Sequence, residues 1–146
     1  MRRNKQIGLL VCDLDYFKQV NDTHGHDIGD QMLKETASIL KSSVREADLV
    51  IRFGGEEFLV LLLDLEPGMA VGVAEKIRAK MEQFKLPVGD SVLQKSISIG
   101  VSEFPHDTDG FWQAIKYADV ALYQAKETGR NRVVRFTPEM WAHGDF

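Results

Sequence analysis

The stretch LVIRFGGEEFLVLLL, residues 49–63, predicts the centre of the fold. Two apolar, β-prone runs, 49–53 and 58–63, are joined through Gly54 and Gly55, the pattern of an antiparallel hairpin with a tight turn. Glycines in such a turn either reach a positive φ or let a ligand approach the backbone closely, and the sequence leaves both interpretations open. The turn also places Glu56 and Glu57 at its exit, where the two carboxylates repel each other unless cations compensate them.

Around this hairpin, apolar strands and amphipathic helices alternate along the chain. Strands are predicted for the apolar or alternating ranges 7–12, 96–104 and 133–136. Helices are predicted where apolar residues recur every three or four positions, over 27–44, from Pro67 to residue 84, and over 111–125. The fold class is therefore α+β, an α/β sandwich with helices on a mixed, mainly antiparallel sheet, and residues 137–146 are expected to form a C-terminal tail.

Length and composition restrict the class of protein. A chain of 146 residues with 44% hydrophobic and 27% charged residues fits one folded domain. The net charge of −4 argues against a nucleic-acid-binding surface, so any anion site must be local. The single Cys12 lies in an apolar run, which is typical of a core thiol in a protein of the reducing cytoplasm. No apolar segment of the sequence is long enough to span a membrane.

Four acids follow predicted strands or the hairpin turn. Asp13 and Asp15 come at the end of the first strand, and Glu56 and Glu57 leave the turn. If the first strand lies beside the hairpin, Asp13 and Glu56 converge at one edge of the sheet, where such oxygens could hold Mg²⁺ together with substrate phosphates. The alternative interpretation is that all four are solvated strand-end and turn acids.

Three blocks in order resemble the GGDEF family of diguanylate cyclases. They are DLDYFKQVNDTHGHDIGD at 13–30, RFGGEEF at 52–58, and SISIGV at 96–101 followed by ADVALYQAK at 118–126 and GRN at 129–131. The resemblance covers about residues 7 to 136 and implies a domain at 1–136 with a GGEEF variant of the signature. It implies a cyclase- or polymerase-palm-like sheet, with the hairpin carrying the active-site turn.

The resemblance implies condensation of two GTP molecules into cyclic di-GMP and two pyrophosphates. Each domain would hold one GTP, so the 3′-hydroxyl of each would attack the α-phosphate of the other across a homodimer. Two Mg²⁺ or Mn²⁺ ions per site would be bound by Asp13, the backbone carbonyl of Leu14, and Glu56. Glu57 would be a further catalytic acid beside the metals and the attacking hydroxyl.

The resemblance also implies a substrate-binding set. Guanine would be bound by Asn21 and Asp30, and a carboxylate at Asp30 favours GTP over ATP because it accepts from the N1–H and N2–H₂ donors of guanine. The phosphates would be bound by Phe17 and Lys18, in a loop whose amides approach them, and by Gly54, Gly55, Lys126 and Arg130. Without the resemblance, Asn21 and Asp30 would be helix caps, and Lys126 and Arg130 solvated cations.

A second site is implied by Arg45 and Asp48, which match the Arg-x-x-Asp pattern of the family's product-inhibition site. Arg45 can donate to phosphate or guanine acceptors, and Asp48 can accept from the guanine edge. Lys76 aligns with a further arginine of that site but lacks the planar guanidinium fork. The alternative interpretation of Arg45 and Asp48 is an ordinary surface ion pair.

The start of the chain departs from the family pattern. No Asp-x-Leu-Thr element and no preceding helix is found before Ile7. We therefore expect the chain to be a piece of a longer bacterial signalling protein, whose sensory or receiver domain controls dimerisation and whose membrane anchoring the sequence leaves open. Two alternatives to a cyclase are a catalytically silent module that binds GTP or cyclic di-GMP, and a nucleotidyltransferase that makes another linkage. The intact set of Asp13, Glu56, Glu57, Asn21 and Asp30 argues against the first. The second shares the metal chemistry but explains neither the Arg45/Asp48 pair nor the complete motif set.

Overall fold

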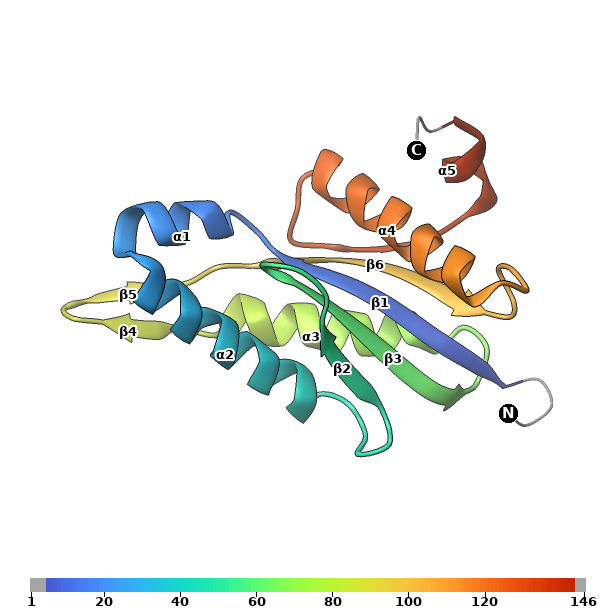
Figure 1. Cartoon of the computed structure of the whole chain (residues 1–146), viewed down its shortest axis with the longest axis horizontal. Coiled ribbons are helices and arrows are strands. Elements are labelled where there is room, and N and C mark those ends of the chain that lie inside the picture. Colours follow the sequence, from blue (N-terminus) through green and yellow to red (C-terminus); the bar gives the residue numbers. More distant parts are fainter. Residues whose placement is uncertain (1–4, 144–146) are drawn as a thin grey trace.

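A five-stranded sheet forms the centre of the computed structural model, which describes residues 5–143 (Figure 1). Its strand order is β2 (Leu49–Arg52), β3 (Glu57–Leu65), β1 (Gln6–Leu14), β6 (Ile97–Phe104) and β7 (Val133–Arg135). Every neighbouring pair is antiparallel except β6 and β7, which are parallel. The predicted mixed, mainly antiparallel sheet is confirmed. The hairpin belongs to this sheet, because β3 pairs with β1 along almost its whole length.

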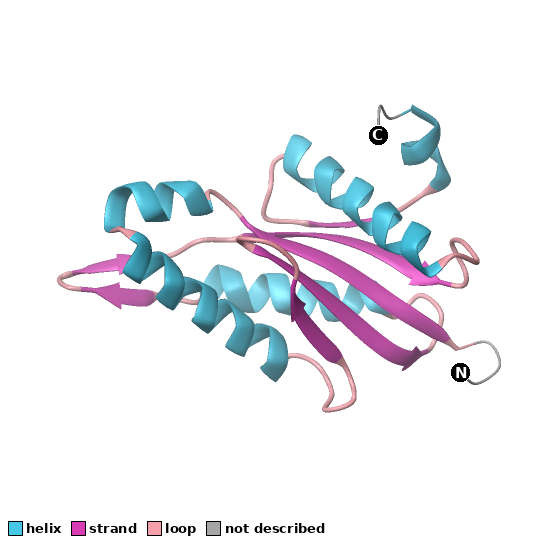
Figure 2. Ribbon diagram, in the orientation of Figure 1, coloured by secondary structure: helices cyan, strands magenta, loops and turns pink. Residues whose placement is uncertain are grey.

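Helices cover both faces of the sheet (Figure 2). The helices are α1 (Phe17–His24), α2 (His26–Ser42), α3 (Ala70–Gln83), α4 (Phe111–Glu127) and α5 (Pro138–His143). Leu10 and Cys12 of β1 belong to the core cluster under α2 and α3, whereas Leu9 and Val11 belong to the cluster under α4. Both sets are fully buried, which is why β1 is a continuous apolar run in the sequence instead of an alternating one.

The structure contains three elements that the sequence pattern did not predict. They are α1, α5 and a separate hairpin of β4 (Leu86–Val88) and β5 (Ser91–Leu93). Phe17 and Val20 are the buried residues of α1, and two apolar positions are too few to reveal a helical period. The segment expected to be a tail contains α5, and the Trp141 ring lies 5.4 Å from that of Tyr117 on α4. Residues 144–146 of that segment lie outside the described range.

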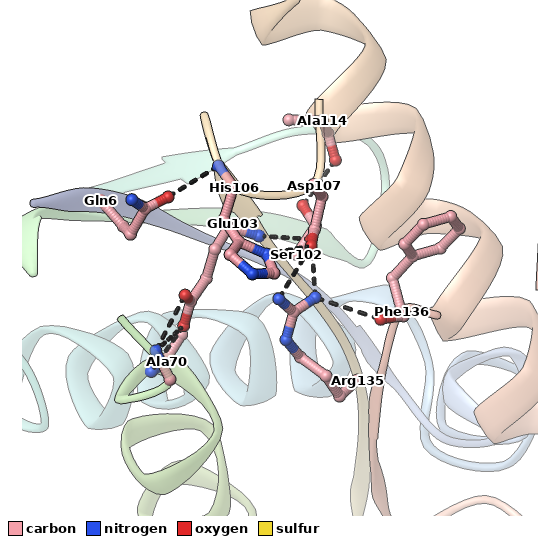
Figure 3. A network of polar contacts seen from close by, with 10 residues as sticks. Gln6, Ala70, Ser102, Glu103, His106, Asp107, Ala114, Arg135 and Phe136 are labelled. Carbon is pink, nitrogen blue, oxygen red and sulfur yellow. Dashed lines mark hydrogen bonds and ion pairs between the residues drawn. The ribbon is translucent and has the colours of Figure 1, made fainter. Parts of the chain in front are cut away.

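A polar network fixes the start of α3 and the end of β6 (Figure 3). The carboxylate of Glu103, which is 1% exposed, accepts hydrogen bonds from the backbone N–H groups of Gly68 (2.9 Å) and Ala70 (3.4 Å). Asp107 accepts two hydrogen bonds from the guanidinium of Arg135, at 2.6 and 2.9 Å. The prediction that α3 begins at Pro67 is wrong: Gly68 has a φ of 85°, so the chain turns there and the helix starts at Ala70.

The β2–β3 turn keeps the backbone of both glycines accessible. The N–H of Phe53 donates to the carbonyl of Glu57 (2.8 Å), and the guanidinium of Arg52 donates to the carbonyl of Gly55 (2.7 Å). Neither Gly54 nor Gly55 has a positive φ, so the first interpretation of these glycines is wrong. A Cβ added to Gly55 would meet no atom within 4 Å, which fits a backbone open to a ligand.

None of the helices within residues 5–143 combines the length and the apolar character needed to cross a bilayer.

Candidate active site

The carboxyl end of β1 meets the exit of the hairpin turn. In the β1–β3 register, Asp13 lies directly opposite Glu57, and Glu56 precedes Glu57 at the end of the turn. Cross-strand partners in an antiparallel pair project to the same face of the sheet. The expected meeting of the first strand and the hairpin is therefore confirmed, with Glu57 as the residue opposite Asp13.

Asp13 is a buried carboxylate that the protein satisfies only in part. Its Oδ2 accepts a hydrogen bond from the Nζ of Lys126, whereas its Oδ1 is buried and has no hydrogen-bond partner. Burial raises the pKa of Asp13, the hydrogen bond and the charge of Lys126 oppose that rise, and the charges of Glu56 and Asp15 add to it. An unpaired buried acceptor costs roughly 1–3 kcal/mol, so this oxygen is a strong candidate for binding a cation.

Asp15 lies two residues further along but has no free oxygen for a cation. Its Oδ1 accepts from the hydroxyl of Ser98 (2.7 Å), and its Oδ2 accepts from the hydroxyl of Ser96 (2.6 Å) and the backbone N–H of Asn131 (2.9 Å). The residue is 1% exposed. The short-range pattern alone treats Asp13 and Asp15 alike, and only the family resemblance implies Asp13 as a metal ligand. The hydrogen bonds of Asp15 agree with that choice.

Glu57 lies in a group of negative charges. Burial raises its pKa, the charges of Asp13 and Asp119 raise it further, and Lys126 opposes the rise. Asp119, on α4, also has a raised pKa because of burial. Asp119 is not among the site residues predicted from the sequence. Asp119 and Lys126 are seven residues apart, which is two helical turns. This spacing could have shown that both lie on one face of α4.

The predicted guanine-binding residues come from two helices that pack closely together. A Cβ added to Gly29 of α2 would lie 1.9 Å from the Oδ1 of Asn21 on α1. Asn21 therefore lies against the backbone beside Asp30, whose own side chain is exposed. Only glycine at position 29 allows this approach.

Phe17 and Lys18 form the first turn of α1, so the prediction of a loop at these positions is wrong. Phe17 is buried and Lys18 is exposed. The irregular residue is Tyr16, whose φ of 58° redirects the chain from β1 into the helix. Since the first amides of a helix have no intrahelical acceptor, the backbone here can still donate to an anion.

Two of the predicted phosphate-binding cations, Lys126 and Arg130, both reach the end of β1. Lys126, in the last turn of α4, contacts Asp13. Arg130 follows in the loop after the helix, and its guanidinium carbon lies 4.8 Å from the ring centre of Tyr16. Residues that are far apart in the sequence thus gather cations, carboxylates and exposed backbone at one end of the sheet.

Arg45 and Asp48 form a closer unit than a solvated surface pair. The carboxylate of Asp48 accepts from the Nε (3.1 Å) and Nη2 (2.9 Å) of Arg45 and from the backbone N–H of Leu63 (2.9 Å). Burial alone would raise the pKa of Asp48, but these hydrogen bonds hold it below its usual value. Arg45 keeps an exposed side chain, and together with Asp48 and Lys76 it lines an open pocket of about 320 Å³.

The donor set near Asp13 fits a divalent cation that receives few ligands from the protein. Across residues 5–143, no group of three or more His, Cys, Asp or Glu side chains is arranged to hold a metal ion. The predicted metal site needs fewer side chains: its ligands are the carboxylates of Asp13 and Glu56 and the backbone carbonyl of Leu14. Mg²⁺ commonly takes one or two carboxylates and completes its coordination with water and substrate phosphates. The unpaired Oδ1 of Asp13 agrees with such a site.

Comparison with known proteins gives one consistent family. The family model described as "Diguanylate cyclase, GGDEF domain" matches residues 1–132. Diguanylate cyclase A of Treponema denticola is 41% identical over 131 residues, which are 90% of this chain and 35% of that protein. The chain thus spans about a third of the length of this curated relative.

Solved structures of the same domain superpose on this fold. The GGDEF domain of PA1120 (YfiN or TpbB) from Pseudomonas aeruginosa has a TM-score of 0.86 at 36% identity, covering 91% of this chain and 83% of that one. The GGDEF domain of DgcB from Caulobacter crescentus, solved in complex with c-di-GMP, has a TM-score of 0.83 at 30% identity, covering 90% and 78%.

Proposed function

Because this chain belongs to the diguanylate cyclase GGDEF family, we propose that it condenses two GTP molecules into cyclic di-GMP and two pyrophosphates. The observation that carries the proposal is the buried, unpaired Oδ1 of Asp13, a residue that lies opposite Glu57 in the sheet and contacts Lys126 of α4. A purely structural carboxylate would have its oxygens satisfied, as Asp15 does. The open oxygen therefore supports a site built for a cation.

Asp13, Glu56 and the carbonyl of Leu14 are the residues proposed to hold two Mg²⁺ or Mn²⁺ ions. When bound, such ions polarise phosphate oxygens and compensate the charge of the departing pyrophosphate. Glu57, whose pKa is raised by burial and by neighbouring acids, is suited to accept the proton of the attacking 3′-hydroxyl.

Substrate recognition is proposed to involve two parts of the site. Asn21 and Asp30, on adjacent helices, bind the guanine edge and select GTP over ATP. The phosphates are bound by a set of amides and cations: Phe17, Lys18, Gly54, Gly55, Lys126 and Arg130. Lys126 donates to Oδ2 of Asp13, so its ammonium group lies beside the proposed metal ligand, where it would also be able to bind a phosphate.

The reaction requires a homodimer, because each domain supplies one GTP and the two α-phosphates must face each other. We propose that the pocket of Arg45, Asp48 and Lys76 binds cyclic di-GMP and lowers activity by restricting how the domains meet. The complex of the DgcB domain with c-di-GMP supports product binding by this fold. The parent protein is proposed to be cytoplasmic in this part, with a sensory or receiver domain that controls pairing.

The test is incubation of the purified chain with GTP and Mg²⁺, with identification of the products. We expect cyclic di-GMP and pyrophosphate, no corresponding product from ATP, and a rate that rises faster than linearly with protein concentration. Glu57→Ala is the matched control and should abolish the product while it still binds GTP. Guanine-selective binding without any product, even at the highest protein concentration, would instead favour a silent nucleotide-binding module.

A further inference from the structure

The loop after α4 has an unusual backbone that carries Arg130. Gly129, Arg130 and Asn131 are three consecutive residues with positive φ, at 131°, 62° and 47°. Glycine adopts such angles freely, whereas residues with a Cβ are disfavoured there. A conformation of this kind persists only when surrounding contacts hold it in place. The contacts that fix this turn therefore decide where Arg130 is presented.

Asn131 supplies most of these contacts. Its backbone N–H donates to the Oδ2 of Asp15 (2.9 Å) at the end of β1. Its side-chain Oδ1 accepts from the Nη1 of Arg78 (3.0 Å), and its Nδ2 donates to the Oε2 of Glu82 (2.6 Å). Arg78 and Glu82 both lie on α3. One residue thus joins the turn to β1 on one side and to α3 on the other.

Asp15 connects the same turn to Tyr16. Asp15 is almost fully buried and holds the hydroxyls of Ser96 and Ser98 besides the N–H of Asn131. The next residue, Tyr16, also has a positive φ, and its ring lies under the Arg130 guanidinium. The N–H of Arg130 itself donates to the carbonyl of Ala125 (2.9 Å), while Asp15 holds the next backbone N–H and the residue after Asp15 supplies the ring under the guanidinium.

We propose that Asn131 is a positioning residue for triphosphate binding: by tying the left-handed turn to Asp15 and to α3, it presents Arg130 to the terminal phosphates of the nucleotide. Asn131 itself does not contact the substrate. The proposal rests on the proposed function. It predicts that loss of the Asn131 side chain weakens only the part of binding that depends on Arg130.

The decisive variant is Asn131→Gly. Glycine tolerates the left-handed backbone and keeps the N–H that bonds Asp15, but it removes the contacts to Arg78 and Glu82. The ligands are 3′-deoxy-GTP, which lacks the attacking hydroxyl and cannot react, and GMP, which lacks the β- and γ-phosphates. We expect the dissociation constant of 3′-deoxy-GTP to rise about three- to tenfold and that of GMP to stay unchanged. The rise corresponds to a part of the binding free energy that one charge-assisted hydrogen bond contributes.

A double-mutant cycle separates positioning from general damage. In an Arg130→Ala background, Asn131→Gly should weaken 3′-deoxy-GTP binding no further, because the group that it positions is already gone. Equal weakening of GMP, or a full additional loss in the Arg130→Ala background, would overturn the proposal. Should Asn131→Gly fail to fold, Glu82→Ala removes the partner of Nδ2 from the exposed surface of α3 and should raise the 3′-deoxy-GTP constant about twofold, again without an effect on GMP.

The outcome also distinguishes this inference from the function on which it rests. If the unmodified chain binds 3′-deoxy-GTP no more tightly than 3′-deoxy-ATP, both the proposed function and the inference fall. If the unmodified chain selects guanine and Asn131→Gly binds both guanine ligands as before, the inference falls and the proposed function stands.

Discussion

The two ends of the central β1–β6 pair both hold buried carboxylates, but the protein satisfies them very differently. At the end where β1 begins, Glu103 accepts from backbone N–H groups at the start of α3, and Asp107 accepts from Arg135 (Figure 3). At the end where β1 finishes, Asp15 is satisfied as well, but Asp13 has one buried oxygen without a partner.

The pKa values differ in the same direction as the hydrogen bonds. Burial alone would raise the pKa of Asp107, but hydrogen bonds from Arg135, from the backbone N–H of Glu103 and from His106 lower it overall. The pKa of Asp13 is raised, because burial outweighs its single contact with Lys126. Satisfied carboxylates at the beginning of β1 thus stabilise the fold. At its other end, Asp13, which we propose binds a metal ion, has an oxygen whose burial lowers stability.

We call the end of β1 that holds Asp13 the open end and the end that holds Glu103 the satisfied end. Removal of the charge of Asp13 at the open end should have the largest effect on activity and little effect on stability. Asp13→Asn should lower cyclic di-GMP formation at least about a thousandfold, since metal ions contribute several kcal/mol to such reactions. Its free energy of unfolding should stay within about 1 kcal/mol of the unmodified value or rise, because an unsatisfied carboxylate is replaced by a neutral amide. Both quantities are measurable, by product assay and by urea unfolding.

Asp15→Asn is the matched control at the same strand end. Because both oxygens of Asp15 accept hydrogen bonds, this variant should lose about 1–3 kcal/mol of stability. If the two variants lose stability equally, the distinction drawn between Asp13 and Asp15 is wrong.

The satisfied end should show the reverse behaviour. Glu103→Ala leaves the N–H groups of Gly68 and Ala70 without their acceptor and should lower the free energy of unfolding by about 2–4 kcal/mol. Glu103→Gln retains an acceptor oxygen and should lose less than half of that. Cyclic di-GMP formation per folded molecule should be the same in both variants, and a selective loss of activity in Glu103→Gln would contradict the separation of the two ends.

The sequence predicted the open end better than the satisfied one. The short-range pattern of β1 and the turn brought Asp13 and Glu56 to one edge of the sheet, and the family resemblance added Glu57 and Lys126 to the same site. Nothing in the pattern indicated that Glu103 caps α3, since that bond joins residues 35 positions apart. The same limit hid the contacts of Asn131 with Arg78 and Glu82, 53 and 49 positions away.

Local geometry was the other limit of the sequence analysis. The helix α1 follows a left-handed Tyr16, and α3 is delayed by a left-handed Gly68. Such single-residue angles are decided by tertiary contacts and are not visible in a hydrophobic period. The fold class depends on periods and was predicted, whereas the first residue of these two helices depends on contacts and was not.

A smaller effect is expected from the cation at the open end. Lys126→Met frees the second oxygen of Asp13, so Mn²⁺ added without nucleotide should bind about twofold to fivefold more tightly. This change in affinity corresponds to the free energy of one partly exposed ion pair. Binding of 3′-deoxy-GTP should weaken in the same variant. Lys116→Met, on the same helix but beside Trp141, is the control and should change neither constant. Weaker Mn²⁺ binding in Lys126→Met would show that Lys126 does not compete with the metal.

The smallest effect is a pair of opposite pH dependences, measured without metal or nucleotide. Asp107 has a lowered pKa, so its stabilisation is present above the unfolded value, about 3.9, and is lost as the pH falls through the folded pKa. At neutral pH, Asp107→Asn should have a lower free energy of unfolding than the unmodified chain, and this difference should vanish in acid. Asp13 has a raised pKa, so its ionised form is the costly one, and the advantage of Asp13→Asn should grow as the pH rises from about 4. Urea unfolding from pH 3 to 7 measures both differences, and two slopes of the same sign would show that the ends of β1 do not differ in the way that their hydrogen bonds indicate.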